Sequence, residues 1–234
     1  MTKRIYLVLL ACLALAPAAR ADLVFFDIDA DPGAWNAAVA GLSASAAYDF
    51  SLDPDYLFDS FDGPLDAAGR GPVSAGTVAA GVSITAEPGS GSPELVVMGV
   101  SEGLGTTQNV VAANFFVDDT VVSFVDAVSA FAFNVVELID FGSIDIVARD
   151  SEGGSTVFTD ILAGLGHNVG ILATGTTRLS AVALAGVGEG LQGAGTLYRE
   201  SARVPAPPTL LLLGLALAGM GASALRRPCR RGSA

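Results

Sequence analysis

The sequence is poor in cysteine, histidine and basic residues. Its 234 residues include two cysteines and one histidine, and 12 Lys or Arg residues stand against 24 Asp or Glu residues. Cys12 lies in an apolar run near the N-terminus and Cys229 lies among arginines near the C-terminus. The long stretch between them therefore cannot form an internal disulfide, and it offers no ligand set for Zn²⁺ or iron.

The few basic residues are unevenly distributed along the chain. Seven of the 12 fall near the two ends, at Lys3, Arg4, Arg20, Arg226, Arg227, Arg230 and Arg231. Residues 22–203 keep all 24 acidic residues against five arginines, a formal net charge of −19. Such a charge repels nucleic acid and anionic lipid, so we expect neither as a partner of this central part.

Residues 1–21 have the three parts of a secretory signal peptide. Two basic residues precede an apolar run at residues 5–16, which is too short to span a bilayer. Ala19 and Ala21 then provide the small residues of a cleavage site. We expect signal peptidase to cut after Ala21, so that the exported chain begins at Asp22.

Residues 204–234 form a second arrangement of three parts. A proline-rich lead-in at 204–208 precedes an uncharged segment, Thr209–Leu225, that is mostly Leu, Ala and Gly. As a helix this segment would be roughly 25 Å long, somewhat short of a hydrocarbon core of about 30 Å but long enough to span it without tilt. The arginines at 226–234 would hold the end of the chain on the cytoplasmic side. The sequence thus predicts a C-terminal transmembrane helix in the inner membrane.

The lead-in and the basic end also carry a family resemblance. Its residues are Val204, Pro205, Ala206, Pro207, Pro208 and Thr209, followed by the Leu-Gly-Ala helix and Arg226, Arg227, Arg230 and Arg231. This arrangement resembles the PEP-CTERM sorting signal of Gram-negative bacteria that make extracellular polysaccharide, with Ala206 where the family has Glu. The resemblance implies processing by an exosortase-type membrane enzyme near residues 205–208 and delivery to the cell surface. A plain single-span anchor is the alternative.

Residues 22–203 are expected to form one all-β domain. Short runs rich in β-branched and aromatic residues recur about every ten residues, which favours a single antiparallel β-sandwich. The expected strands are residues 23–28, 77–86, 94–100, 110–117, 121–125, 128–138, 143–149, 155–161, 179–184 and 195–199. Phe131, Phe133 and Val135 alternate with other residues, so they should face a core. Asp150–Gly154 should form a hairpin turn.

One short helix is expected before most of the strands. Asp31 can cap it, Pro32 fits its first turn and Gly41 can end it. Trp35 and Val39 form an apolar pair that should dock on the sandwich, and a carbohydrate-stacking Trp35 is the alternative. The Trp-bearing helix is followed by an Asp-Phe strand at residues 49–50, a Phe-x-Phe strand, a Gly-Gly hairpin and a final strand just before the tail. This order is similar to the bodies of many PEP-CTERM proteins. This similarity implies a jelly-roll or lectin-like sandwich.

A short glycine motif raises an enzymatic alternative. Ser101 is the central serine of a G-x-S-x-G match, and His167 follows it in hydrolase order with Asp150 or Asp160 between. The residues behind Ser101 are a poor helix start, and His167 stands among glycines. We therefore expect a strand and a glycine turn at Ser101, with His167 in a loop.

A second glycine motif matches the pattern of a dinucleotide site. Gly188–Gly193 fits G-x-G-x-x-G, but a strand rather than a helix follows it. The acidic residue that such a site needs further along the chain is also missing. We expect a glycine-rich hairpin loop there.

The acidic residues suggest one possible cofactor, Ca²⁺. Every second residue from 27 to 31 is an aspartate (Asp27, Asp29 and Asp31), a spacing that calcium ligands often have. However, Pro32 stands where an EF-hand needs Gly. A denser group is interleaved with aromatic residues and consists of Asp49, Asp53, Asp55, Asp59, Asp62 and Asp66. Such a loop can hold Ca²⁺, although a solvated acidic loop with aromatic anchors is the default expectation.

These observations favour an exported, non-enzymatic protein of the cell surface or extracellular matrix. Signal peptidase, an exosortase-type enzyme and the inner membrane are its expected partners, and no cofactor is required. One alternative is a lectin-like module that binds extracellular polysaccharide, with or without Ca²⁺. A secreted esterase that uses Ser101 is the more distant alternative.

Overall fold

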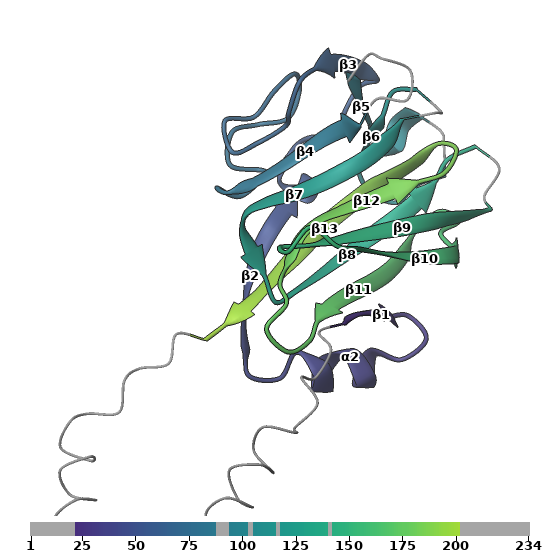
Figure 1. Cartoon of the computed structure of the whole chain (residues 1–234). Helices are drawn as coiled ribbons and strands as arrows, with labels where there is room; N and C mark the ends of the chain where they lie inside the picture. The colour runs from purple at the N-terminus through teal and green to yellow at the C-terminus, as the bar shows by residue number, and fades with distance from the viewer. Residues whose placement is uncertain (1–21, 88–93, 103–104, 116–117, 140–141, 202–234) are drawn as a thin grey trace, which may run out of the picture. The chain divides into compact units, whose positions relative to one another are not determined.

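The computed structural model describes residues 22–87, 94–102, 105–115, 118–139 and 142–201. They form two antiparallel β-sheets that pack face to face, with one α-helix beside them (Figure 1). The expected antiparallel sandwich is therefore confirmed. The signal peptide, with Ala19 and Ala21, and the whole sorting tail, with its expected transmembrane helix, lie outside the described residues. Within the ranges given above, no helix is long and apolar enough to cross a membrane.

The larger sheet has eight strands. Its order is β1-β11-β8-β13-β6-β5-β3, and β2 also pairs with β13. The bounds are β1 Leu23–Asp27, β2 Leu42–Asp49, β3 Asp59–Asp62, β5 Glu94–Met98, β6 Val110–Ala113, β8 Ala130–Glu137, β11 His167–Ala173 and β13 Glu189–Glu200. β13 is the longest strand. It pairs with β8 along one edge, and along the other edge it is long enough to pair with β6 and then with β2.

The smaller sheet has five strands in the order β10-β9-β12-β7-β4. The bounds are β4 Val82–Glu87, β7 Asp119–Val128, β9 Ser143–Asp150, β10 Ser155–Leu162 and β12 Leu179–Ala185. The β9–β10 hairpin turns where the sequence predicted it. There the Asp150 carboxylate accepts hydrogen bonds from the backbone N–H groups of Glu152 and Gly154, both at 2.8 Å. Two 3₁₀ turns, η1 Phe50–Leu52 and η2 Val100–Glu102, lie between the early strands.

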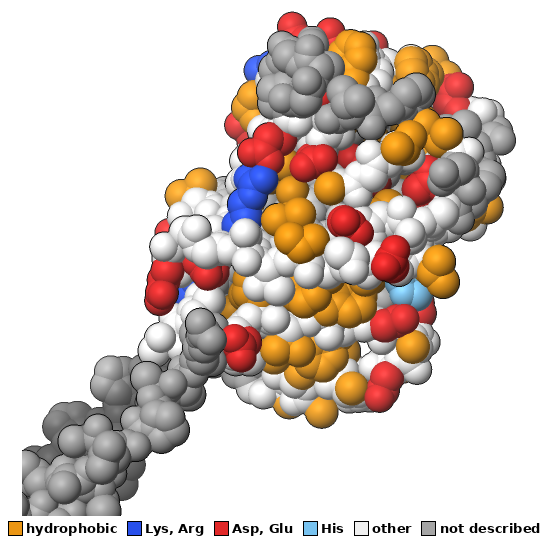
Figure 2. Space-filling view, turned by 45° about the vertical axis from the view of Figure 1, so that its right-hand side comes forward, with side chains coloured by type: hydrophobic (Ala, Val, Ile, Leu, Met, Phe, Trp, Pro, Cys, Tyr) orange, Lys and Arg blue, Asp and Glu red, His pale blue; other side chains and the backbone are white. Residues whose placement is uncertain are grey.

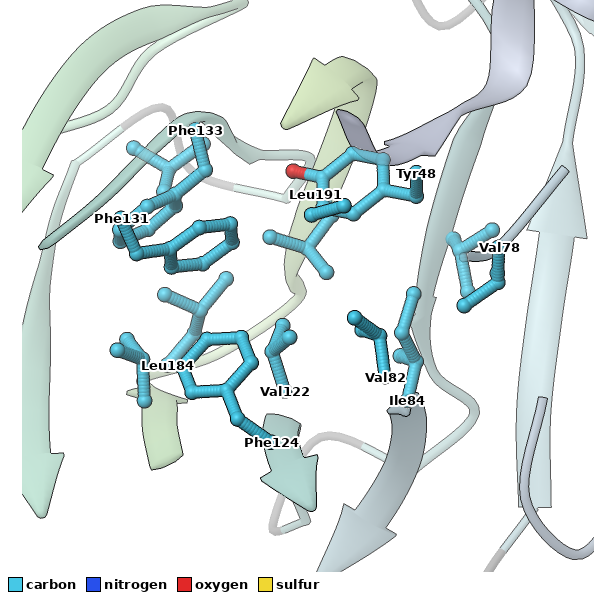
Figure 3. Close-up of a cluster of buried hydrophobic side chains, with 14 of the residues drawn as sticks. Tyr48, Val78, Val82, Ile84, Val122, Phe124, Phe131, Phe133, Leu184 and Leu191 are labelled. Atoms are coloured by element: carbon cyan, nitrogen blue, oxygen red, sulfur yellow. The ribbon is translucent and has the colours of Figure 1, made fainter. Parts of the chain in front are cut away.

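The core lies between the two sheets, where side chains from both point toward one another (Figure 3). Phe131 and Phe133 of β8 stack with ring centroids 4.6 Å apart, and Phe124 of β7 meets Phe131 edge-on at 5.2 Å. The predicted inward face of this strand is thus confirmed. Fully burying each such ring contributes roughly 2–3 kcal/mol, so aromatic contacts across the sandwich are a large part of its stability.

The helix forms as the sequence predicted. It is α2, Pro32–Ala38, and Asp31 caps it by accepting a hydrogen bond from the Ala34 N–H at 2.9 Å. Gly41 adopts a φ of +95°, which turns the chain into β2. Trp35 is 3% exposed, and with Val39 it packs on the outside of the larger sheet. The docking of this pair is confirmed, and the burial leaves little of the indole free to stack on a sugar.

Two sequence predictions about glycine-rich segments were wrong. His167 lies in strand β11 and not in a loop, because residues from His167 onward pair with β8. Gly170 lies inside this strand, where the Trp35 side chain approaches the backbone closely. Gly188–Gly193 is not a hairpin loop, because β12 and β13 belong to different sheets. Most of that motif lies inside β13, so the glycines follow a crossover between the sheets. Strand β3 was also not predicted, and of β2 only its last residue, Asp49, was expected in a strand, whereas Phe50 begins η1.

Candidate functional site

The outer face of the larger sheet is hollowed beside α2. Strand register sets Ala132 of β8 opposite Thr196 of β13, and together with Ala194 these small side chains form the floor. Trp35 and Tyr198 stand on one side of it. This outer hollow has a volume of about 230 Å³ and is lined by Ile28, Trp35, Asn36, Ala132, Phe133, Asn168, Ala194, Thr196 and Tyr198.

The aromatic side of the outer hollow is held rigidly. The rings of Trp35 and Tyr198 meet edge-on with centroids 5.4 Å apart, and Phe26 of β1 supports Trp35 from another side at 5.4 Å. Trp35 is buried, whereas Tyr198 is only partly covered. Tyr198 is therefore the ring that the hollow offers to a ligand, and Trp35 fixes its position.

A row of three amide side chains runs beside the outer hollow, and one of them, Asn168, also lines it. Strand register sets Asn168 of β11 opposite Asn134 of β8, and Asn134 opposite Gln192 of β13. Asn134 Nδ2 donates to Asn168 Oδ1 at 3.0 Å, and Gln192 Nε2 donates to Asn134 Oδ1 at 3.0 Å. These residues alternate with buried core residues along their strands, so they point away from the core. We call Asn168, Asn134 and Gln192 the amide ladder.

Asp29 closes the ladder at its exposed end. Its carboxylate accepts one hydrogen bond from the Asn168 side-chain amide and another from the Asn168 backbone N–H, both at 2.8 Å. His167 lies between two carboxylates, with Nδ1 3.3 Å from Asp29 and Nε2 3.1 Å from Asp27. Burial on its own would raise the pKa of Asp29, but the Asn168 hydrogen bonds and nearby His167 hold that pKa below its ordinary value.

Gln192 closes the ladder at its buried end. It is 3% exposed, and its Nε2 also donates to the Leu165 carbonyl at 3.1 Å. This bond ties the β10–β11 turn to the sheet. Within the described part of the chain, Gln192 Oε1 has no hydrogen-bond partner. Exposure therefore increases along the ladder from buried Gln192 through half-buried Asn134 to exposed Asn168.

A second, apolar hollow lies on the other half of the same sheet. It has a volume of about 360 Å³, and its lining includes Phe58, Val96, Met98, Ala112, Leu138 and Ile139. Phe58 and Ile139 at its rim are exposed. Its one amide side chain, Asn114, donates to the Glu94 carboxylate at 2.8 Å. This hollow has far fewer polar groups than the one beside α2.

The structure does not bring the proposed esterase residues together. Ser101 lies in η2, where its backbone N–H donates to the Asp55 carboxylate at 3.1 Å. His167 instead contacts Asp27 and Asp29 at the edge of the outer hollow. Of the two candidate acids, Asp150 caps the β9–β10 turn and Asp160 lies within β10. Ser101 and His167 thus have different carboxylate partners.

The acidic residues at 49–66 hold loops in place. Asp53 is 8% exposed and accepts hydrogen bonds from Tyr56 Oη at 2.6 Å, Thr77 Oγ1 at 2.8 Å and the Ser74 N–H. For Asp53 the expectation of a solvated carboxylate was wrong. Four neighbouring aspartates also accept hydrogen bonds from backbone N–H groups. The donors are Ser51 for Asp49, Ser101 for Asp55, Ser60 for Asp59 and Ala68 for Asp66. Among the residues that the structure describes, no three acidic, His or Cys side chains are grouped to hold a metal ion.

Two buried carboxylates were not anticipated from the sequence. Glu137 of β8 and Glu189 of β13 are directly opposite each other and are 1% and 2% exposed. Glu137 accepts the N–H groups of Ile139 and Gly142, both at 2.8 Å. Burial, with the charges of Asp119 and Glu137, raises the pKa of Glu189 to about 8. Only strand register could have shown that these two side chains meet.

Comparisons with known proteins do not assign this chain to a family. No protein-family model matches the chain, and no curated protein matches it. A search of solved structures finds the family 11 carbohydrate-binding module of the cellulosomal cellulase Lic26A-Cel5E of Clostridium thermocellum. It is 11% identical, over 65% of this chain and 95% of that chain, with a TM-score of 0.16. At that TM-score the similarity supports no conclusion about this chain.

Proposed function

We propose that this chain is an exported protein of the cell surface or extracellular matrix whose sandwich binds carbohydrate in the outer hollow. In this proposal the protein is not an enzyme. Its C-terminal tail is the substrate of an exosortase-type enzyme, which receives the tail from the inner membrane. The signal peptide and the sorting tail of the sequence support the export, and the outer hollow supports the binding.

The observation that carries the binding proposal is the pairing of Tyr198 with Asn168 across a floor of small side chains. A pyranose ring has an apolar C–H face and a rim of hydroxyl groups. A partly exposed aromatic ring suits the face, and amide groups, which both donate and accept, suit the rim. A hollow with an apolar wall and a few convergent polar groups is the usual form of a small-ligand site.

The surrounding charge is consistent with an extracellular domain. Acidic side chains far outnumber basic ones on the face seen in Figure 2. A net charge well away from zero keeps a secreted domain soluble and opposes binding to nucleic acid. The central part of the chain has no cysteine, so its stability depends on its core.

Calorimetric titration of the full chain in mild detergent against a panel of soluble polysaccharides tests the binding. We expect Ala194→Gln, which fills the floor of the outer hollow, to weaken binding at least tenfold. Ala127→Gln, in β7 of the other sheet, is the matched control and should bind like the parent. Heat release that is the same for both variants, or absent for every polysaccharide, would remove the binding proposal.

Intact-mass measurement on protein from the native host tests the export. We expect the mature chain to begin at Asp22 and to end within the lead-in at 204–208. Deletion of residues 226–234 should leave the tail unprocessed, because the basic end stops the helix in the membrane. A full-length cytosolic chain that keeps both apolar ends would contradict this part of the proposal.

A further inference from the structure

We propose that the amide ladder is the surface that recognises ligand hydroxyl groups, and that its ligand is a neutral glycan bound without a metal ion. This inference depends on the proposed carbohydrate binding and specifies the chemistry of that same site. The residues that contact the ligand are Asn168, which lines the outer hollow, and Asn134, which lies next to it on β8. Asp29 is a positioning residue, because it orients the two amides and need not touch the glycan itself.

The direction of the ladder is fixed from its exposed end. An ionised carboxylate can only accept hydrogen bonds, so Asn168 must turn its NH₂ group toward Asp29. The Asn168 oxygen then faces Asn134, which must present its own NH₂ group. The Asn134 oxygen in turn faces the NH₂ group of Gln192. One charge therefore settles the orientation of every amide in the row.

The orientation leaves a regular set of unused hydrogen-bonding positions. An amide side chain has two donor hydrogens and two acceptor lone pairs. Within the described part of the chain, the side chains of Asn168 and Asn134 each use one donor hydrogen and one acceptor lone pair in the ladder. Each side chain therefore retains one donor hydrogen and one acceptor lone pair for a ligand. The strands that carry them are about 4.8 Å apart. Neighbouring hydroxyl groups of a sugar, which also donate and accept, can pair with such a row.

The charges around the ladder favour a neutral ligand. Asp29 closes its exposed end and Asp27 lies across His167 from Asp29, so both carboxylates would repel a uronate or sulfate group. In the described part of the chain, Arg149 pairs with Glu87 and Arg178 with Glu200. Arg70 donates to the Asp62 carbonyl, and Arg199 follows Tyr198 on the opposite side of β13. Among the described residues, no arginine is thus placed to pair with an anionic sugar at the ladder.

The hydrogen bonds of Asp29 and Asp27 explain why the binding should not need Ca²⁺. A cation that bridges protein and sugar requires several oxygen ligands that converge on one point. Asp29 Oδ1 is taken by the Asn168 side chain and Asp29 Oδ2 by the Asn168 backbone. Asp27 Oδ1 accepts the Ala30 N–H at 2.8 Å and lies beside His167. These oxygens are already engaged by protein donors.

The test compares a neutral polysaccharide with a uronic-acid polysaccharide, both titrated into the full chain in mild detergent, once with CaCl₂ and once with EDTA. We expect the neutral glycan to bind with unchanged affinity in EDTA and the anionic one to bind at least tenfold more weakly. Asn168→Ala should lose about tenfold in affinity for the neutral glycan, because two hydrogen bonds are removed. Asp29→Asn should weaken binding severalfold, since an amide at position 29 can present either its oxygen or its NH₂ group.

A spectroscopic measurement separates positioning from simple loss of structure. In Asp29→Asn the side-chain amide resonances of Asn168 and Asn134 should move, while the thermal midpoint stays near that of the parent. Asp126→Asn removes the same charge from β7 and should change neither. In the parent, the neutral glycan should shift these amide resonances, a readout that requires no variant to fold.

The outcomes distinguish the two proposals. If a glycan binds but leaves the ladder resonances unmoved, or binds only with Ca²⁺, or binds equally when anionic, this inference is wrong and the carbohydrate function remains. If a folded Asn168→Ala protein binds the neutral glycan as tightly as the parent does, this inference is likewise wrong and the carbohydrate function remains. If the parent binds no glycan at all, the proposed function fails and the inference fails with it.

Discussion

The indole ring of Trp35 lies directly on the backbone of Gly170 in β11. A methyl group at position 170 would be 2.5 Å from Cζ3 of Trp35 and 2.6 Å from Cε3. Gly170 does not have a positive φ, so its backbone would accept any residue. The glycine is required because the ring needs the space. This contact sets how closely α2 approaches the sheet, and thereby where one wall of the outer hollow stands.

Gly170→Ala should therefore destabilise the sandwich by about 1–3 kcal/mol, the usual cost of overpacking. The measurement is urea unfolding followed by tryptophan fluorescence, which reports Trp35 directly because it is the only tryptophan. Trp35→Phe in the Gly170→Ala background should recover part of the loss, since the smaller ring relieves the clash. A double-mutant cycle with no coupling between the two positions would contradict this account.

Gly170 also shows why some strands could not be predicted from the sequence. The β9–β10 turn and the α2 cap depend on neighbours within four residues, so local patterns were sufficient to find them. A glycine inside a strand resembles loop sequence unless the side chain that covers it is known. Here that side chain is Trp35, 135 positions earlier in the chain. β11 was consequently mistaken for a loop.

The amide ladder could not be predicted from the sequence either, because its members are far apart in the chain. Asn134 alternates with phenylalanines, which predicts only that it points outward. Its partners Asn168 and Gln192 are 34 and 58 residues away. Their alignment depends on the register of β8 with two neighbours, and a shift of one residue would turn them to the other face. Tertiary pairing, and not local preference, builds this site.

Asp53 provides a test of what the acidic loop does. Asp53→Asn keeps the shape of the side chain but turns an NH₂ group toward donors from Tyr56, Thr77 and Ser74. We expect a loss of about 2–4 kcal/mol, because buried donors lose their acceptor. Asp59→Asn is the matched control, since Asp59 is exposed and, among the described residues, accepts a hydrogen bond only from the N–H of the next residue. Urea unfolding curves of both variants provide the measurement.

Calcium addition to the same proteins separates a structural loop from a metal site. If Asp53 serves only to hold the loops, CaCl₂ should leave the unfolding midpoint of the parent unchanged. A ligand that binds only the folded state raises stability by mass action. A midpoint that rises with CaCl₂ in the parent, and does not rise in Asp53→Asn, would instead place a Ca²⁺ site at this loop.

Glu189 should make the sandwich less stable as the pH rises. Burial raises its pKa from an ordinary value of 4.5 to about 8, and the negative charges of Asp119 and Glu137 add to the effect. Between these two pH values the folded chain holds a proton that the unfolded chain has released. Stability therefore falls with increasing pH across the window from about 4.5 to about 8, and the loss is complete above it.

Glu189→Gln should remove this dependence, because the amide stays neutral at every pH. At pH 8 we expect the variant to exceed the parent in unfolding free energy by on the order of a few kcal/mol. At pH 4.5 the two should be nearly equal, since Glu189 is then protonated in the folded parent. Glu152→Gln, in the exposed β9–β10 turn, is the control and should follow the parent at both pH values. Urea unfolding between pH 4.5 and 8.5 measures all three proteins, and parallel curves for parent and Glu189→Gln would show that the Glu189 carboxylate is ionised in the fold.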